Sequence, residues 1–372
     1  MEVRSLFSLF DTLTLTDDWH RCPRIHSCYG GAAVFEKLLP RAHAHNLRIV
    51  SIYRRGYPPS SGFCDDELAG IGFQKKHAEP FLRAQGAEIA TFLVNFAVAQ
   101  DIPLADPDPN NPNVGGIVLI GWSLGGIHVL ALLAYLDELP EDTQLTLTQY
   151  LHTVLSHGET AVQTLKLHPD YLSPSHPWLS DSTALALGIP NVPGYNSDLW
   201  SETDDRKLFD SFFDWVTGHF THKSVTSENA DDLESNHPSD IPHSLDNLSY
   251  AQRAEYTCLD AFSGTGCDRK LMFCDIIVFA ALTKRALFDK ARAEKSPNIR
   301  VRYMSSGASS GALIWLLWML RKYAEGPPEE LYGSDAEKAR DIRFIIQTEG
   351  NHFIFWEDPE EAIRQYDVAI NL

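Results

Sequence analysis

The sequence contains little that points to a metal site, a disulfide scaffold or an exported protein. Its 372 residues include six cysteines, none of them in a Cys-x-x-Cys pair, and no His-Glu-x-x-His motif occurs. A short apolar stretch at residues 6–10 meets an aspartate at once and is too short for a signal-peptide core. We therefore expect reduced thiols, no metal ion and a cytoplasmic location.

Positive charge is scarce as well. The chain has 31 Lys and Arg against 50 Asp and Glu, which gives a formal net charge of −19. Such a balance argues against broad binding to nucleic acid phosphates or to anionic membranes. Part of the acidity lies in residues 222–247, which hold six acids and one lysine with several Ser, Asn and Pro. This composition predicts a disordered, mobile loop.

A clean membrane-spanning run is also missing. Residues 117–136 are nearly all apolar, but glycine, serine and histidine interrupt them. A buried strand, a tight turn and a buried helix explain this stretch better than a membrane span. We expect no transmembrane segment.

Strand and helix patterns alternate along the chain. Apolar residues recur at helical spacing in residues 76–100, and residues 116–120 form a short apolar run of the kind found in strands buried on both faces. The alternation predicts an α/β fold with a mainly parallel sheet. The expected strands are 47–53, 116–120, 150–156, 299–303 and 342–346; the expected helices are 76–100, 124–139 and a short one that a capping box at Ser334 and Glu337 would open.

The strongest motif is the Gly-x-Ser-x-Gly sequence of Gly121, Ser123 and Gly125. A serine nucleophile needs a sharp turn between a strand and a helix, in which side chains at the flanking positions would collide. Ser123 has this context, with an apolar strand before it and an apolar helix after it. The alternative is that Ser123 is merely a small residue in a tight turn.

A histidine follows the last predicted strand. His352 lies in a Gly-Asn-His sequence at residues 350–352, where a loop histidine can reach a nucleophile and act as its general base. Ser309, in a second Gly-x-Ser-x-Gly match at 307–311, is too close to His352 in the chain to leave room for the rest of a sheet. The order nucleophile, acid, histidine therefore favours Ser123.

At these residues the chain resembles the α/β-hydrolase superfamily of the α/β hydrolase-1 type. The resemblance rests on residues 116–126, on residues 350–352 and on the Arg-Arg-Gly-Tyr-Pro sequence at 54–58. It implies a mostly parallel sheet of eight strands flanked by helices, a catalytic triad and an inserted helical cap. We accordingly expect residues 1–160 and 296–372 to form the catalytic core and residues 161–295 to form the cap, with the disordered loop at about 222–247.

The resemblance also implies two features that this sequence supplies irregularly. Members of the superfamily usually carry His-Gly after an early strand as part of the oxyanion hole; here residues 27–31 stand in that place, so the amides of Tyr29 and Leu124 are the expected donors. The usual place for the acid, the loop at 305–310, has no carboxylate. Glu159, one strand earlier, is the first candidate for the acid; the weaker alternatives are Asp275, Asp260 or an ordinary solvated role for Glu159.

The resulting hypothesis is a cofactor-independent serine hydrolase of carboxylesterase or lipase type. Its partner would be a small-molecule ester or acyl substrate and not a nucleic acid. Two alternatives remain open: a catalytically impaired, hydrolase-like binding or scaffold protein, and an acyltransferase, because fold and triad do not fix the acceptor.

Overall fold

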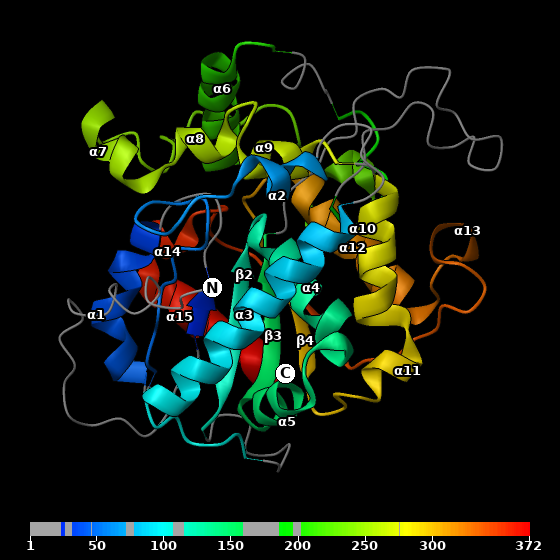
Figure 1. The fold of residues 1–372 in the computed structure, drawn as a ribbon. Helices are drawn as coiled ribbons and strands as arrows, with labels where there is room; N and C mark the ends of the chain where they lie inside the picture. Colours follow the sequence, from blue (N-terminus) through cyan, green and yellow to red (C-terminus); the bar gives the residue numbers. More distant parts are fainter. Residues whose placement is uncertain are drawn as a thin grey trace.

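The computed structural model describes residues 24–26, 32–45, 47–71, 78–106, 115–158, 186–195, 202–274 and 276–372 (Figure 1). Within them a five-stranded sheet has the order β1-β2-β3-β4-β5, and every neighbouring pair is parallel. The strands are β1 (Arg24–His26), β2 (Ile117–Trp122), β3 (Leu151–His157), β4 (Arg300–Ser306) and β5 (Ile342–Gln347).

Helices surround the sheet and cap its carboxyl end (Figure 1). They are α1 (Leu39–Ala42), α2 (Asp65–Ala69), α3 (Glu79–Ala99), α4 (Gly125–Tyr135), α5 (Glu141–Tyr150), α6 (Asp205–Thr217), α7 (Tyr250–Tyr256), α8 (Leu259–Phe262), α9 (Cys267–Met272), α10 (Ile276–Thr283), α11 (Lys290–Ala293), α12 (Gly311–Glu325), α13 (Glu329–Tyr332), α14 (Ile354–Glu357) and α15 (Pro359–Asn371). Short 3-10 helices include η2 (Ala32–Leu38), η4 (Leu136–Glu138) and η7 (Ala186–Gly188), and η10 (Lys284–Phe288) is a π-helix.

The last two residues of β2 illustrate how the sheet is covered on both faces. Neighbouring residues of a strand point to opposite faces. Gly121 faces the backbone of α4, whereas the ring of Trp122 packs edge-on against Phe35 of η2 and Phe355 of α14. Burial on both sides explains why all six residues of β2 are apolar or glycine and all are buried.

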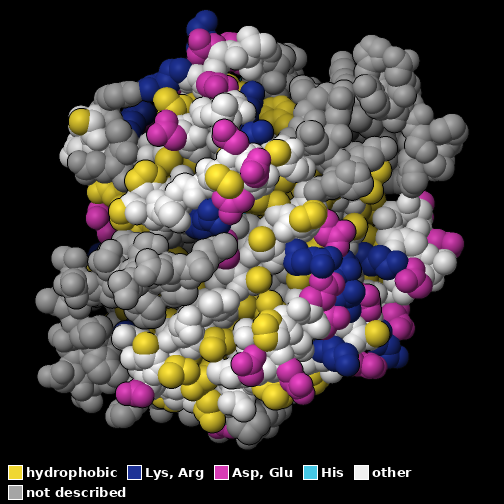
Figure 2. All heavy atoms as spheres, viewed as in Figure 1, with side chains coloured by type: hydrophobic (Ala, Val, Ile, Leu, Met, Phe, Trp, Pro, Cys, Tyr) yellow, Lys and Arg dark blue, Asp and Glu magenta, His cyan; other side chains and the backbone are white. Residues whose placement is uncertain are grey.

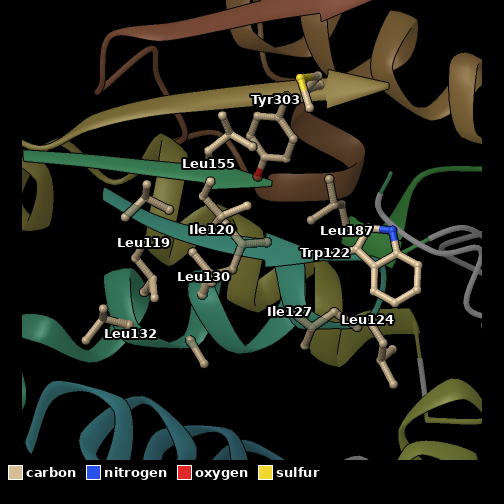
Figure 3. Packing of buried hydrophobic residues seen from close by; sticks show 14 of the residues in the cluster. Leu119, Ile120, Trp122, Leu124, Ile127, Leu130, Leu132, Leu155, Leu187 and Tyr303 are labelled. Atoms are coloured by element: carbon tan, nitrogen blue, oxygen red, sulfur yellow. The ribbon is translucent and has the colours of Figure 1, made fainter. Parts of the chain in front are cut away.

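The core is continuous between β2 and the helix that follows it. Figure 3 shows apolar side chains of β2, such as Leu119, and of α4, such as Leu130, projecting into the space between strand and helix. Every residue of α4 is buried because α3 covers its outer side. No helix of the described residues is long and apolar enough to cross a membrane.

The predicted α/β fold with a mainly parallel sheet is confirmed, and α3, α4 and strands β2 to β5 lie within a few residues of the predicted ranges. Two predicted elements are wrong. Residues 47–53 form no strand, because strand composition alone does not supply a pairing partner, and within the described residues β1 pairs with β2 alone. The helix expected after Ser334 is absent, because the amide of Glu337 donates to the carbonyl oxygen of Phe288 and draws the chain out of a helical path.

The number of strands also differs from the implied eight, since the described part of the chain contains five. In the range expected for the cap, α6 to α9 lie above the carboxyl end of the sheet (Figure 1), whereas α10 and η10 pack against α4 of the core. The last helices of the range 161–295, α10 and η10, therefore contact the core.

Residues 222–247 are irregular, as their composition indicates, but the core holds them in place at several points. His222 Nε2 donates to the carbonyl oxygen of Ser309 (2.8 Å), and the amide of Gly311 donates to the carbonyl oxygen of Glu234 (2.7 Å). Trp215 Nε1 donates to the carbonyl oxygen of Ser235 (2.8 Å). These bonds join the segment to α6 and to the start of α12, whereas its composition indicates a mobile loop. Composition does not show which distant groups bond to a segment.

Charged side chains of both signs are mixed on the surface. On the face drawn in Figure 2, Lys and Arg lie beside Asp and Glu rather than in separate areas. Ion pairs such as Arg292–Asp137 and Arg285–Glu138 connect α11 and η10 to η4. On this face, the acidic side chains therefore lie among basic ones and do not form an area of one sign.

Candidate active site

The backbone at Ser123 makes the sharp turn that the motif predicts. Ser123 has φ = 56°, a left-handed conformation that few residues other than glycine adopt, between the last residue of β2 and the start of α4. Its amide donates to the carbonyl oxygen of His157 (2.9 Å). A β-carbon on Gly121 would lie 2.6 Å from the carbonyl oxygen of Gly125, so the turn requires glycine there. This is the strand–turn–helix of a nucleophile elbow.

The second Gly-x-Ser-x-Gly match has a different backbone. Ser309 is not among the described residues with positive φ. It is buried in the turn between β4 and α12, and its carbonyl oxygen accepts the bond from His222. The backbone therefore separates the two matches, which the local sequence context did not, and it agrees with the chain order, which favours Ser123.

The amide that follows Ser123 belongs to Leu124, the residue before α4. Leu124 has helical angles (φ −58°, ψ −18°) directly after the positive φ of Ser123, and α4 begins at Gly125. A left-handed residue followed by a right-handed one aims successive amides into one concavity, at the positive end of the helix dipole. Tyr29, the other expected donor, lies outside the described residues.

His352 lies beside this turn. Its ring is 4.9 Å from that of Trp122, centroid to centroid, and tilted by 32°. Trp122 Nε1 donates to the carbonyl oxygen of His352 (3.1 Å). Within the described part of the chain, neither Nδ1 nor Nε2 of His352 has a hydrogen-bond partner. The chain thus brings the predicted base next to the residue before Ser123, although these ring nitrogens make no bond to the serine.

Burial keeps the His352 ring neutral. Removal from water, with a smaller contribution from neighbouring His157, lowers the pKa of His352 well below its ordinary value. Burial also lowers the pKa of His157 to about 3; its Nδ1 lies 2.9 Å from the Tyr366 hydroxyl and its Nε2 lies 3.2 Å from the Ser306 hydroxyl. A neutral imidazole is the form that can accept a proton.

The His352 ring lies against the residue that follows β3. A β-carbon built on Gly158 would be only 2.5 Å from Nδ1 of His352, so this nitrogen faces the point where β3 ends. Glu159 follows directly but lies outside the described residues, as does Asp275. Asp260 is described: it is exposed on α8, and no hydrogen bond is found between it and His352.

Both predicted reactive side chains are closed off from solvent. Ser123 is 1% exposed and His352 is 2% exposed. An open hollow of about 700 Å³ lies elsewhere, between α6, including Asp214 and Trp215, and residues 236–243. Among the described residues, no group of three or more His, Cys, Asp or Glu side chains could hold a metal ion.

Sequence reasoning missed one buried ionic cluster near the Arg-Arg-Gly-Tyr-Pro sequence. Arg54 pairs with Asp268 of α9, and the Tyr57 hydroxyl donates to the same carboxylate. The Asp268 side chain is fully buried and that of Arg54 is 5% exposed. The sequence shows only an arginine beside a turn-rich loop. It does not identify Asp268 as the partner, because the two residues are 214 positions apart in the chain.

Comparison with known proteins gives structural similarity only. No protein-family model matches the chain, and no curated protein is significantly similar to it. Similar solved structures include a lipase-esterase related protein from Clostridium acetobutylicum (12% identity, 94% of this chain and 93% of that one, TM-score 0.42). Others are a bromoperoxidase from Bacillus anthracis (13%, 94% and 92%, TM-score 0.43) and a variant of epoxide hydrolase from Solanum tuberosum (13%, 93% and 91%, TM-score 0.45).

At these identities and TM-scores the similarities carry no argument about activity. The molecule's own architecture is more informative: a parallel sheet covered on both faces, with a sharp strand–turn–helix at Ser123 and a histidine after the last strand. The sequence resemblance implied a parallel sheet flanked by helices with such a turn and such a histidine.

Proposed function

We propose that the protein is a cofactor-independent serine hydrolase of carboxylesterase or lipase type, acting on small ester or acyl substrates. The observation that carries the proposal is the positive φ of Ser123 at the junction of β2 and α4. A non-glycine residue in this strained conformation is costly, by about 1–3 kcal/mol, and such strain concentrates at functional sites. Glycine adopts this conformation without that cost.

The mechanism follows from the groups near the elbow. Ser123 Oγ attacks the substrate carbonyl carbon while neutral His352 accepts the hydroxyl proton. The resulting oxyanion is stabilised by the amide of Leu124 and, we expect, by that of Tyr29. The tetrahedral intermediate collapses as His352 returns the proton to the leaving alcohol. Water then attacks the acyl-enzyme by the same route and releases the acid.

The third member of the triad is proposed to be Glu159. His352 Nδ1 faces Gly158, the residue before it. A carboxylate here would accept a hydrogen bond from Nδ1, fix the tautomer that leaves Nε2 free to take the serine proton, and stabilise the imidazolium once it forms.

A second candidate function, a hydrolase-like binding protein without activity, is favoured by one observation. The His352 ring nitrogens have no hydrogen-bond partner among the described residues, and both reactive groups are closed off from solvent. In an active enzyme this geometry tightens when substrate binds. In a binding protein no such tightening is needed.

Hydrolysis of p-nitrophenyl esters by wild type, Ser123→Ala and Ser309→Ala separates the two candidates. The two serines are matched because each is the central residue of a Gly-x-Ser-x-Gly sequence and each is buried. We expect Ser123→Ala to lower kcat by at least about a thousandfold, since a triad without its nucleophile loses nearly all its catalysis. Ser309→Ala should keep the wild-type rate. Equal rates for wild type and Ser123→Ala would overturn the proposal.

A further inference from the structure

The residue before His352 is held unusually firmly. The Asn351 side chain is fully buried, and both of its polar atoms are hydrogen-bonded. Its Nδ2 atom donates to the carbonyl oxygen of Thr217 (2.8 Å) and to the Ser244 hydroxyl (2.7 Å), and it lies 3.3 Å from the carbonyl oxygen of Gly218. Its Oδ1 atom accepts from the amide of Phe353 (2.8 Å).

A second set of contacts joins the same two parts of the chain. Ser244 Oγ donates to Glu357 Oε1 (2.5 Å), and His219 Nε2 lies 2.9 Å from Glu357 Oε2. Ser244 is therefore bonded both to Asn351 and to Glu357. The loop that carries His352, from residue 351 to residue 357, is fastened at both ends to the segment from Thr217 to Ser244.

This fastening matters because the His352 ring has little else to fix it. Its nitrogens have no hydrogen-bond partner within the described residues, so no polar contact of the ring itself sets its position there. Apart from packing on the rings of Trp122 and Phe353 and against Gly158, its position is set by the course of its own backbone. The backbone of His352 lies between Asn351 and Phe353. The Asn351 side chain fixes both neighbours, because its Nδ2 donates to Thr217 and its Oδ1 accepts from the amide of Phe353.

We propose that Asn351 is a positioning residue for His352, an inference that rests on the proposed hydrolase function. By tying residues 351–353 to Thr217 and Ser244, the Asn351 amide holds the imidazole beside Ser123, where it accepts the serine proton once bound substrate tightens the site. Proton transfer and attack depend steeply on this geometry, and a misplacement of about 1 Å can cost about a hundredfold in rate. Substrate binding depends on it much less.

The separation of kcat from KM distinguishes positioning from a purely structural role. A residue that only stabilises the fold changes the amount of folded enzyme, whereas a positioning residue changes kcat of the folded enzyme. Asn351→Asp is the sharpest variant, because it keeps the shape and the acceptor for the Phe353 amide but removes the donor to Thr217. Ser244→Ala is the milder variant, because it removes one partner of Asn351 and leaves the bond to the Thr217 carbonyl oxygen.

The matched control is Ser296→Ala. Ser296 is also a buried serine whose hydroxyl is bonded to a polar side chain, in this case Arg340 (3.1 Å). It precedes β4, so it lies at the amino end of the parallel strands, whereas Ser123 lies at their carboxyl end. Its loss should lower the melting temperature without touching the reactive groups.

The experiment measures kcat and KM for a p-nitrophenyl ester, the rate of fluorophosphonate labelling at Ser123 and the melting temperature of each variant. For folded Asn351→Asp we expect kcat and the labelling rate to fall about ten- to a hundredfold, with KM changed less than about threefold. Ser244→Ala should show a smaller loss in the same direction, and Ser296→Ala none.

Wild-type kcat in folded Asn351→Asp and Ser244→Ala would overturn the inference, as would losses that simply follow the melting temperature in all three variants. If Asn351→Asp does not fold, an unchanged kcat in Ser244→Ala overturns it alone. A wild-type protein that neither hydrolyses the ester nor labels at Ser123 overturns the proposed function, and this inference with it. An active wild type with unaffected variants overturns this inference only.

Discussion

Nδ1 of His352 lies directly against the α-carbon of Gly158. A β-carbon on Gly158 would be 2.5 Å from Nδ1 and 2.7 Å from Cε1 of the ring. Gly158 follows β3 directly and has φ = 59°, and its amide donates to the carbonyl oxygen of Met304 (2.8 Å) in β4. The site is therefore built where parallel strand ends meet, with the imidazole occupying the space that a side chain at residue 158 would fill.

The first prediction follows from this contact. Gly158→Ala should displace the His352 ring and lower kcat by about a hundredfold. It should also destabilise the fold by about 1–3 kcal/mol, because alanine is strained at positive φ. Ester hydrolysis and chemical unfolding measure the two effects separately.

Gly194→Ala is the matched control, since Gly194 has φ = 79° but no heavy atom within 4 Å of a built β-carbon. It carries the same backbone strain without the clash, so it should lose stability and keep kcat. An active Gly158→Ala enzyme would contradict the described position of His352.

The second prediction concerns the acid of the triad. Glu159→Gln keeps the size of the side chain but removes the charge that would stabilise the imidazolium. Loss of the acid from a serine triad lowers kcat by about ten-thousandfold, and we expect a fall of that order. Asp260→Asn is the control, because Asp260 is exposed on α8 and should not matter. The reverse pattern would transfer the role of the acid to Asp260, and no effect from either variant would exclude both.

The third prediction concerns stability against pH. Burial lowers the pKa of His157 to about 3 from its ordinary value of 6.5, and it lowers the pKa of His352 in the same direction. Below pH 6.5 the unfolded chain thus binds more protons than the folded one. The contribution of these rings to stability is complete above pH 6.5 and is lost as the pH falls toward 3.

Unfolding in urea at pH 7, 6 and 5 measures this loss. The free energy of unfolding should fall by up to about 1.4 kcal/mol per pH unit for each histidine. His157→Gln, which removes one of the two groups, should show a shallower fall than wild type. Identical slopes for the two proteins would contradict the assigned direction of the His157 pKa.

The fourth prediction concerns the buried pair of Arg54 and Asp268. Arg54→Met retains much of the volume but leaves the Asp268 carboxylate buried without its cation, which costs about 3–5 kcal/mol. Arg206→Met breaks the exposed pair with Asp210, whose side chains are 42% and 56% exposed, and should cost less than about 1 kcal/mol. Urea unfolding of both variants tests the contrast. Equal small losses would show that the Arg54 pair is not desolvated as described.

The sequence predicted those parts of the molecule that depend on local patterns. The apolar run of β2, the turn at Ser123 and the loop after β5 follow from residues that are neighbours in the chain. The Arg54–Asp268 pair joins residues 214 positions apart, and nothing in either segment identifies the other. The same holds for Asn351 and Ser244, which are 107 positions apart.

Other differences have physical causes that local patterns do not carry. Residues 47–53 have the composition of a strand, but a strand also needs a pairing partner, and among the described residues β1 pairs with β2 alone. Residues 222–247 have the composition of a mobile loop, yet His222 and Glu234 bond to the turn that precedes α12 and to its first residue. Glu159 and Tyr29 stay predictions.

Whether Ser123 is an activated nucleophile is tested most directly by labelling the folded full-length protein with a fluorophosphonate, followed by mass spectrometry of the labelled peptide. We expect one label at Ser123, which is lost in Ser123→Ala and retained in Ser309→Ala. A folded protein that takes up no label, or one that is labelled at Ser309, would contradict it.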